Sequence, residues 1–163
     1  MAGVVRGRTG VDGKQGWNVM RIRELHLMTF GKFTDTHIYF PGQLHVIFGE
    51  NEYGKSTIYA FIKAMLFGLE RGKGRAAKND TFSRYEPWEN PNYYAGMMRF
   101  TCGGRNFRLE RHFDRYHKSA ELICEDDGEE LSVENGDLEM LLGGIGEASF
   151  ENMAAIGRLS AKP

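Results

Sequence analysis

Residues 49–56 read GENEYGKS, and this stretch has the residue types and spacing of a phosphate-binding loop. It matches the pattern G-x-x-x-x-G-K-[ST], in which the backbone N–H groups of a tight turn point at phosphate oxygens. Gly49 and Gly54 permit that turn because glycine adopts backbone conformations that other residues disfavour. Lys55 brings a positive charge to the β- and γ-phosphates, and the hydroxyl of Ser56 can ligate Mg²⁺.

The pattern predicts ATP and Mg²⁺ as ligands and assigns no catalytic residue. A chain of this composition matches it by chance in about one case in a hundred. The alternative is a glycine-rich turn that binds nothing, but a strand pattern before the loop and a helix pattern after it favour the phosphate site. We expect Ser56 to contact the metal as well as the nucleotide. The expected nucleotide-binding residues are Gly49, Asn51, Glu52, Gly54, Lys55, Ser56 and Thr57.

The elements that must position this loop lie on both sides of it. Residues 44–48 (LHVIF) form a continuous apolar run, which is typical of a strand buried on both faces. Apolar residues then recur at helical spacing from Ile58 to Leu69. This spacing predicts a helix over 55–68 whose N-terminus faces the phosphates, with Gly68 as its C-terminal stop.

Further strands are predicted on either side of this unit. Two short strands, at 21–30 and 36–40, precede the loop. Strands at 107–113 and 119–124 and a short helix at 134–142 follow it. The sequence therefore predicts an α/β fold, with a mixed sheet around the phosphate-loop helix and an antiparallel meander after it.

The segment 70–93 shows no periodicity. It is basic at first and then rich in aromatic residues and proline, and a loop of this length is usually functional. Tyr85 and Trp88 within it could stack on a nucleotide base or could hold the loop against the sheet. The sequence leaves these two alternatives open.

Composition limits the classes of function. The 163 residues include 21 basic and 22 acidic ones, so the net charge of -1 excludes a uniformly basic nucleic-acid coat. Hydrophobic residues make up 41%, enough for a packed core. Two cysteines form no disulfide framework, and the longest apolar stretch is too short to cross a bilayer. We therefore expect a cytoplasmic protein with no membrane contact.

Two clusters could bind other partners. The basic stretch could contact the backbone of duplex DNA, but solvent-facing positions with ion pairs to Glu110 and Asp114 are the favoured interpretation. This stretch comprises Arg99, Arg105, Arg108, Arg111, Arg115 and Lys118. A zinc site is disfavoured because the spacing of its possible ligands is irregular. Those ligands would be Cys102, His112, His117 and Cys124.

The stretch LHLMTFGKFTDTHIYFPGQLHVIFGENEYGKSTIYAFIKAMLFGL resembles the N-terminal lobe of the SMC/SbcC/RecN-like ATPases, of ABC type. The likeness to their AAA-domain branch lies in the "fGkf" turn, in "GxNExGKST" and in the later "YEPWENPNYYAGMMRF" and "NFRLERHFD". It extends over residues 20–160. Leading strands before the phosphate loop favour this family over a third candidate, a stand-alone nucleotide kinase.

The resemblance implies an ATPase that functions in DNA repair or chromosome maintenance. It also implies a C-terminal lobe or second subunit, dimerisation and duplex DNA as a partner. In the family a glutamine near the end of this lobe helps to hold Mg²⁺, but Arg158 stands at that position here. The signature and Walker B motifs are not found in these residues. We therefore expect poor hydrolysis by the chain alone, and the alternative is a catalytically inactive phosphate-loop module used for binding or assembly.

Residues 1–19 differ from the rest, with glycine at every third position from Gly7 to Gly16. They are predicted to be a flexible extension or a tag, with Met20 as the possible natural start.

Overall fold

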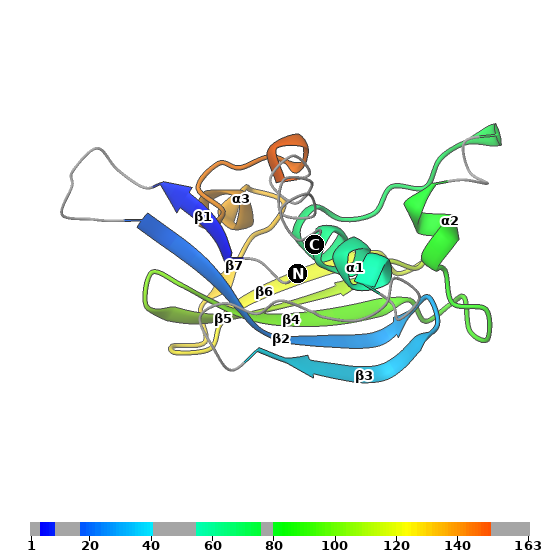
Figure 1. Ribbon diagram of the computed structural model, residues 1–163, viewed down its shortest axis with the longest axis horizontal. Coiled ribbons are helices and arrows are strands. Elements are labelled where there is room, and N and C mark those ends of the chain that lie inside the picture. Colours follow the sequence, from blue (N-terminus) through cyan, green and yellow to red (C-terminus); the bar gives the residue numbers. More distant parts are fainter. Residues whose placement is uncertain (1–3, 9–16, 41–54, 76–79, 151–163) are drawn as a thin grey trace, which may run out of the picture.

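The computed structural model describes residues 4–8, 17–40, 55–75 and 80–150 (Figure 1). These residues form seven strands in one sheet and three helices. The strands are β1 (Val4–Arg8), β2 (Trp17–Phe30), β3 (Phe33–Tyr39), β4 (Ala95–Cys102), β5 (Arg105–His112), β6 (Ser119–Cys124) and β7 (Glu130–Leu131). The helices are α1 (Lys55–Phe67), α2 (Thr81–Tyr85) and α3 (Asp137–Leu141).

The long strand β2 organises the sheet. The order is β1-β2-β4-β5-β6-β7, and β3 also pairs with β2. β1 pairs with the first part of β2, from Trp17 to Arg21, and β3 pairs with its second part, from Glu24 to Phe30. Each strand pair in the described part of the chain is antiparallel.

Alternation along β2 separates the two faces of the sheet. Leu25 and Leu27 are fully buried, and in the strand register they lie beside Met98 and Gly96 of β4, which face α1. His26, which lies between them, points to the opposite, outer face, because successive strand side chains alternate.

Helix α1 lies across the inner face of the sheet (Figure 1). Its buried side carries the apolar residues that the sequence spacing predicts, and these join the core formed by β2, β4 and β5. They are Ile58, Phe61, Ile62, Met65 and Leu66. Gly96 makes the close approach possible, since the ring of Phe61 fills the space that a side chain at Gly96 would need.

The C-terminus of α1 is held from the sheet. Gly68 adopts a left-handed backbone with φ of 81° directly after the helix, so the predicted stop is confirmed. Arg111 of β5 donates from Nε to the carbonyl of Met65 at 2.6 Å and from a terminal nitrogen to that of Leu66 at 3.4 Å. The helix has no basic residue in its own last turn, so this arginine supplies the positive charge that its C-terminus favours.

The observed elements agree with several predictions. The combination of helices and a sheet matches the coarse α/β class, and the helix from Lys55 and the strands near 21–30, 107–113 and 119–124 are confirmed. The expected mixed sheet differs from the described pairs, which are antiparallel. The strand predicted at 44–48 lies outside the described residues.

Two other segments differ from the expectations. Residues 4–8 pair with residues 17–21 as strands, and 4–8 and 17–19 belong to the segment 1–19 that the sequence predicts to be a flexible extension or a tag. The physical reason is the length of β2, which begins at Trp17, before Met20. Its first residues offer backbone hydrogen-bonding groups to β1. The helix predicted at 134–142 is shorter, at Asp137–Leu141, and ends at two left-handed glycines, Gly143 and Gly144.

Candidate functional site

The described part of the motif lies at the start of α1. Lys55 is the first residue of the helix, Ser56 is exposed and Thr57 is half-buried. The remaining expected residues, which are Gly49, Asn51, Glu52 and Gly54, lie outside the described residues, as does Arg158. The last residues of the motif thus belong to a helix, as the phosphate-loop pattern predicts.

A cleft of about 820 Å³ opens beside this helix start. Thr57 lines it from α1, the end of β2 and the β2–β3 turn line it from the sheet, and α2 with the loop after it forms the opposite wall. The lining residues are His26, Met28, Thr29, Gly31, Lys32, Thr34, Asp35, Thr57, Arg84, Tyr85, Pro87, Trp88, Glu89, Asn90 and Tyr93.

The walls of the cleft are tied together at the β2–β3 turn. The backbone N–H of Gly31 donates to the carbonyl oxygen of Tyr85 at 2.6 Å. The ring of Tyr85 stacks on that of Phe30, with centroids 5.2 Å apart and an angle of 18° between the ring planes. Gly31 has a φ of 58°, a conformation that glycine adopts without strain. The turn and α2 are thus fixed relative to each other.

The two aromatic residues of the long loop have different roles. Tyr85 packs on Phe30 and holds the loop against the sheet, which is one of the two predicted alternatives. Trp88 is 95% exposed at the edge of the cleft. Its ring is available to a ligand, so the other alternative stays a prediction for Trp88.

Asp80 fixes the start of α2. Its side chain accepts a hydrogen bond from the backbone N–H of Ser83 at 2.7 Å and another from the N–H of Gly72. The hydrogen bond from Ser83 is the largest influence on the carboxyl group and holds the pKa of Asp80 below its ordinary value. An ionised cap at this position stabilises the first turn, and with it the wall of the cleft.

The electrostatics of the site suit an anion. The first turn of α1 contains no acidic residue, so the positive end of the helix dipole is not neutralised from within the helix. The lining includes two cationic residues, Lys32 and Arg84. It also includes one acidic residue from each wall, Asp35 and Glu89. The arrangement can hold phosphate at the helix start and an aromatic or polar group in the adjacent cleft.

The basic stretch is largely engaged in ion pairs. Arg99 contacts Glu24 at 2.6 Å and Glu125 at 3.1 Å, and Arg105 contacts Asp127 and Glu129 at 2.9 and 3.0 Å. Further pairs join Arg115 to Glu86 at 3.8 Å and Lys118 to Glu70 at 3.0 Å. Ion pairing of the basic stretch, which the sequence favours over contact with DNA, is therefore found for these four residues. The partners differ from Glu110 and Asp114, which instead contact His112 and His117.

The disfavoured zinc set does not gather in the described residues. Cys102 and Cys124 are buried free thiols, and the Cys102 sulfur donates to the carbonyl of Leu141 at 3.4 Å. Burial raises the pKa of Cys102, which keeps the thiol protonated. Within the described ranges, the one group with ligand atoms close enough for a metal is a different set, His26, Asp35 and His37.

Sequence reasoning missed this second set. The signal lay in the tight turn at Gly31, which brings β3 back along β2 and places His37 directly opposite His26. Asp35 lies two residues before His37, and its carboxylate contacts both histidines. The pattern is visible only once the register of the hairpin is known.

Two comparisons bear on the class of protein. Residues 20–84 match the model of the family described as "AAA domain", and this range contains the whole GENEYGKS motif. The matching family is one of phosphate-loop ATPase domains, which agrees with the helix that begins at Lys55.

The chain is also similar to a protein of Bacillus subtilis (strain 168) described as "Uncharacterized protein YhaN". The two are 35% identical over 80 residues, which is 48% of this chain and 7% of the relative. The chain therefore spans less than a tenth of that protein's length in the matched region. Among the described residues, no helix has both the length and the apolar character that crossing a membrane would require.

Proposed function

We propose that this chain binds ATP as the N-terminal half of an SMC/SbcC-like ATPase. The observation that carries the proposal is that a complete phosphate-loop motif runs into α1, which contains its Lys55 and Ser56. Such a helix directs backbone N–H groups and its positive dipole end at phosphate. Ser56, exposed in the first turn, has a hydroxyl suited to Mg²⁺, whose preferred ligands are oxygens.

The cleft supports a more detailed placement of the nucleotide. Thr57 lines it one residue beyond Ser56, so a ligand that contacts the helix start can extend into it. The volume of the cleft, about 820 Å³, is large enough to hold the base and the ribose. In this arrangement Trp88 and Tyr93 offer aromatic surface to the base, and the backbone at Gly31 forms the floor.

Hydrolysis requires more than phosphate binding. Phosphoryl transfer to water needs a positioned Mg²⁺, an oriented water and charge stabilisation together. A phosphate loop holds the phosphates and supplies only part of the ligand shell of Mg²⁺. We propose that a C-terminal lobe or a second subunit supplies the remaining groups, and that ATP turnover is slow until they are present. A role in DNA repair or chromosome maintenance, with duplex DNA as partner, is part of the same proposal and rests on the resemblance.

A second candidate is a binding or assembly module that never hydrolyses ATP. Arg158 at the position of the family's glutamine favours it, because a guanidinium cannot ligate Mg²⁺. The two candidates share nucleotide binding and differ in turnover after the partner lobe is added.

Calorimetric titration of ATP·Mg²⁺ into the full chain tests the shared claim. Wild type should bind, and Lys55→Ala should weaken binding by about 10- to 150-fold, the value of about 1.5–3 kcal/mol for a hydrogen bond to a charged group. Lys118→Ala is the matched control, because it removes the same charge from an exposed ion pair with Glu70. Equal affinity of wild type and Lys55→Ala would contradict the proposal.

Tripolyphosphate tests the role of the cleft separately. It carries the same phosphates without base or ribose, so it should bind the chain more weakly than ATP if the cleft contributes. An equal affinity for both would restrict the site to the helix start.

A further inference from the structure

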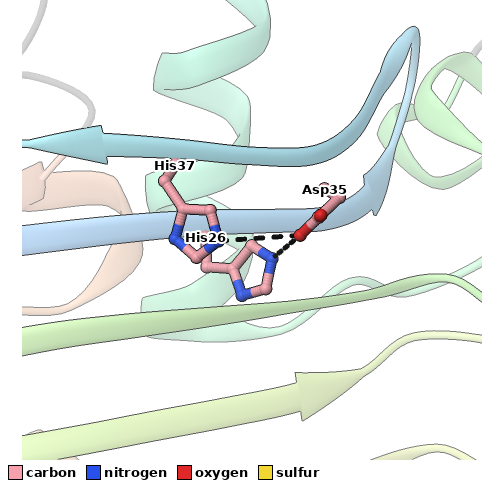
Figure 2. A group of neighbouring side chains, drawn as sticks. All are labelled: His26, Asp35 and His37. Carbon is pink, nitrogen blue, oxygen red and sulfur yellow. Dashed lines mark hydrogen bonds and ion pairs between the residues drawn. The ribbon is translucent and has the colours of Figure 1, made fainter.

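Two histidines and an aspartate gather on the outer face of the β2–β3 hairpin. His26 and His37 are direct partners in the strand register. Asp35 lies on β3, after the turn (Figure 2). The register of the antiparallel pair holds His26 against His37. Asp35 has a left-handed backbone with φ of 44°, and its side chain reaches both rings.

The ligand atoms converge. Asp35 Oδ1 lies 2.7 Å from His26 Nε2 and 3.6 Å from His37 Nε2, so one carboxylate oxygen faces both ring nitrogens (Figure 2). The three ligand atoms all lie within 4.8 Å of one another. Two ligands of one tetrahedral ion lie about 3.4 Å apart when each is about 2.1 Å from the metal. The rings of His26 and His37 are stacked, with centroids 3.8 Å apart and 18° between their planes. Binding of an ion therefore requires the two rings to turn so that both nitrogens face it.

Glu24 orients one of these histidines. Its carboxylate lies 3.0 Å from His37 Nδ1, and the Glu24 side chain is only 8% exposed. Glu24 also accepts a hydrogen bond from Arg99 at 2.6 Å, which fixes its carboxylate in place. When His37 Nδ1 donates to Glu24, Nε2 is the ring nitrogen that can face an ion beside Asp35. A histidine backed by a carboxylate in this way is a frequent arrangement around protein-bound metals.

The donor set selects the class of ion. Two imidazole nitrogens and one carboxylate oxygen suit Zn²⁺ and similar divalent transition ions, whereas Mg²⁺ and Ca²⁺ prefer oxygen ligands throughout. Three protein ligands leave at least one position open on a four-coordinate ion. Asp35, with its side chain 80% exposed, and His26 both line the cleft, so that position is open to a ligand there.

We propose that His26, Asp35 and His37 form a binding site for a zinc-class divalent ion on the wall of the cleft. The convergence of three ligand atoms on one hairpin, with Glu24 behind His37, carries this inference. The site uses none of the phosphate-loop residues and does not depend on nucleotide binding.

Titration of Zn²⁺ into the full chain, prepared without a histidine tag, tests the site. About one ion should bind per chain, and His26→Ala or His37→Ala should weaken binding by at least about tenfold. Asp35→Asn keeps the shape of an exposed side chain but removes its charge, so it should weaken binding while the fold stays intact by circular dichroism. Co²⁺ in place of Zn²⁺ should give visible absorption bands that these variants lose.

His112→Ala is the matched control, because His112 lies on β5 outside the cluster and contacts Glu110 at 3.3 Å. It should bind Zn²⁺ as wild type does. No binding by wild type, an equal loss in His112→Ala, or undiminished binding by Asp35→Asn would overturn the proposal. Lys55→Ala separates the two proposals, because it should lose ATP and keep Zn²⁺.

Discussion

Replacement of Gly96 by alanine should destabilise the protein through the contact between α1 and the sheet. A Cβ at this position would lie 2.2 Å from Cε2 and 2.4 Å from Cζ of the Phe61 ring. Phe61 is fully buried and packs edge-on against Phe30, with ring centroids 5.2 Å apart, so the ring has little space to move into. An ordinary contact of 3.4 Å or more would require the ring to retreat by about 1 Å.

The expected cost of Gly96→Ala follows from overpacking. Extra methylene groups in a packed core typically cost about 1–3 kcal/mol. Because this overlap is severe, we expect Gly96→Ala to lower the free energy of unfolding by about 3 kcal/mol. Urea unfolding followed by circular dichroism measures the change from the shift in midpoint at constant slope. Phe61→Leu in the Gly96→Ala background should recover part of the loss, which gives a coupling energy of about 1 kcal/mol or more.

Gly146→Ala is the matched control for this substitution. No atom lies within 4 Å of a Cβ at Gly146, and its backbone is outside the left-handed region. Its free energy of unfolding should stay within about 0.5 kcal/mol of wild type. A Gly96→Ala protein as stable as this control would refute the claim that the glycine sets the approach of α1.

Three further outcomes follow from buried polar contacts. Arg111→Met should cost about 1–3 kcal/mol in urea unfolding, because two carbonyls at the end of α1 lose a charged donor. Burial lowers the pKa of Arg111 to about 10, still above neutral pH, so the charge is present in the wild type. Tyr94→Phe should cost about 1 kcal/mol, since the buried hydroxyl donates to the carbonyl of Phe82 at 3.2 Å. Burial acts to raise the pKa of Glu24, but the hydrogen bonds with His37 and Arg99 outweigh it and lower that pKa below 4.5. The ionised carboxylate therefore stabilises the fold above pH 4.5, and this contribution is lost as the pH falls through the pKa of the folded state. Stability should therefore drop less between about pH 6 and about pH 3 in Glu24→Gln than in wild type, and an equal drop would contradict this.

The elements with strong local patterns could be predicted from the sequence. The helix from Lys55 was recognisable because its apolar residues repeat at helical spacing and a glycine follows. β5 was recognisable from its alternation, with Phe107 and Leu109 buried between more exposed neighbours. In each case one buried face dictates the pattern.

The strand β4 was harder to predict. Five consecutive residues from Tyr94 to Met98 are buried, so no alternation marks it, and Gly96 is unfavourable in a strand. Its central place between β2 and β5, and the need for a glycine under Phe61, are properties of the tertiary packing. Local sequence does not contain that information.

The candidate site likewise has one part that the sequence predicts and another that only the fold reveals. The phosphate-binding motif is local, since eight consecutive residues carry it and the sequence alone identifies it. The cleft combines β2, α1, α2 and the loop after α2, which are brought together only by the fold. The cluster of His26, Asp35 and His37 depends on hairpin register, and a shift of one residue would send His37 to the other face.

Binding of ADP·Mg²⁺ followed by backbone amide chemical shifts tests the central claim most directly. If the nucleotide lies at the start of α1 and in the adjacent cleft, the amides of Ser56, Thr57, Gly31 and Lys32 should shift, and Lys55→Ala should abolish these changes. Changes confined to β5 and β6, or identical changes in Lys55→Ala, would contradict the account.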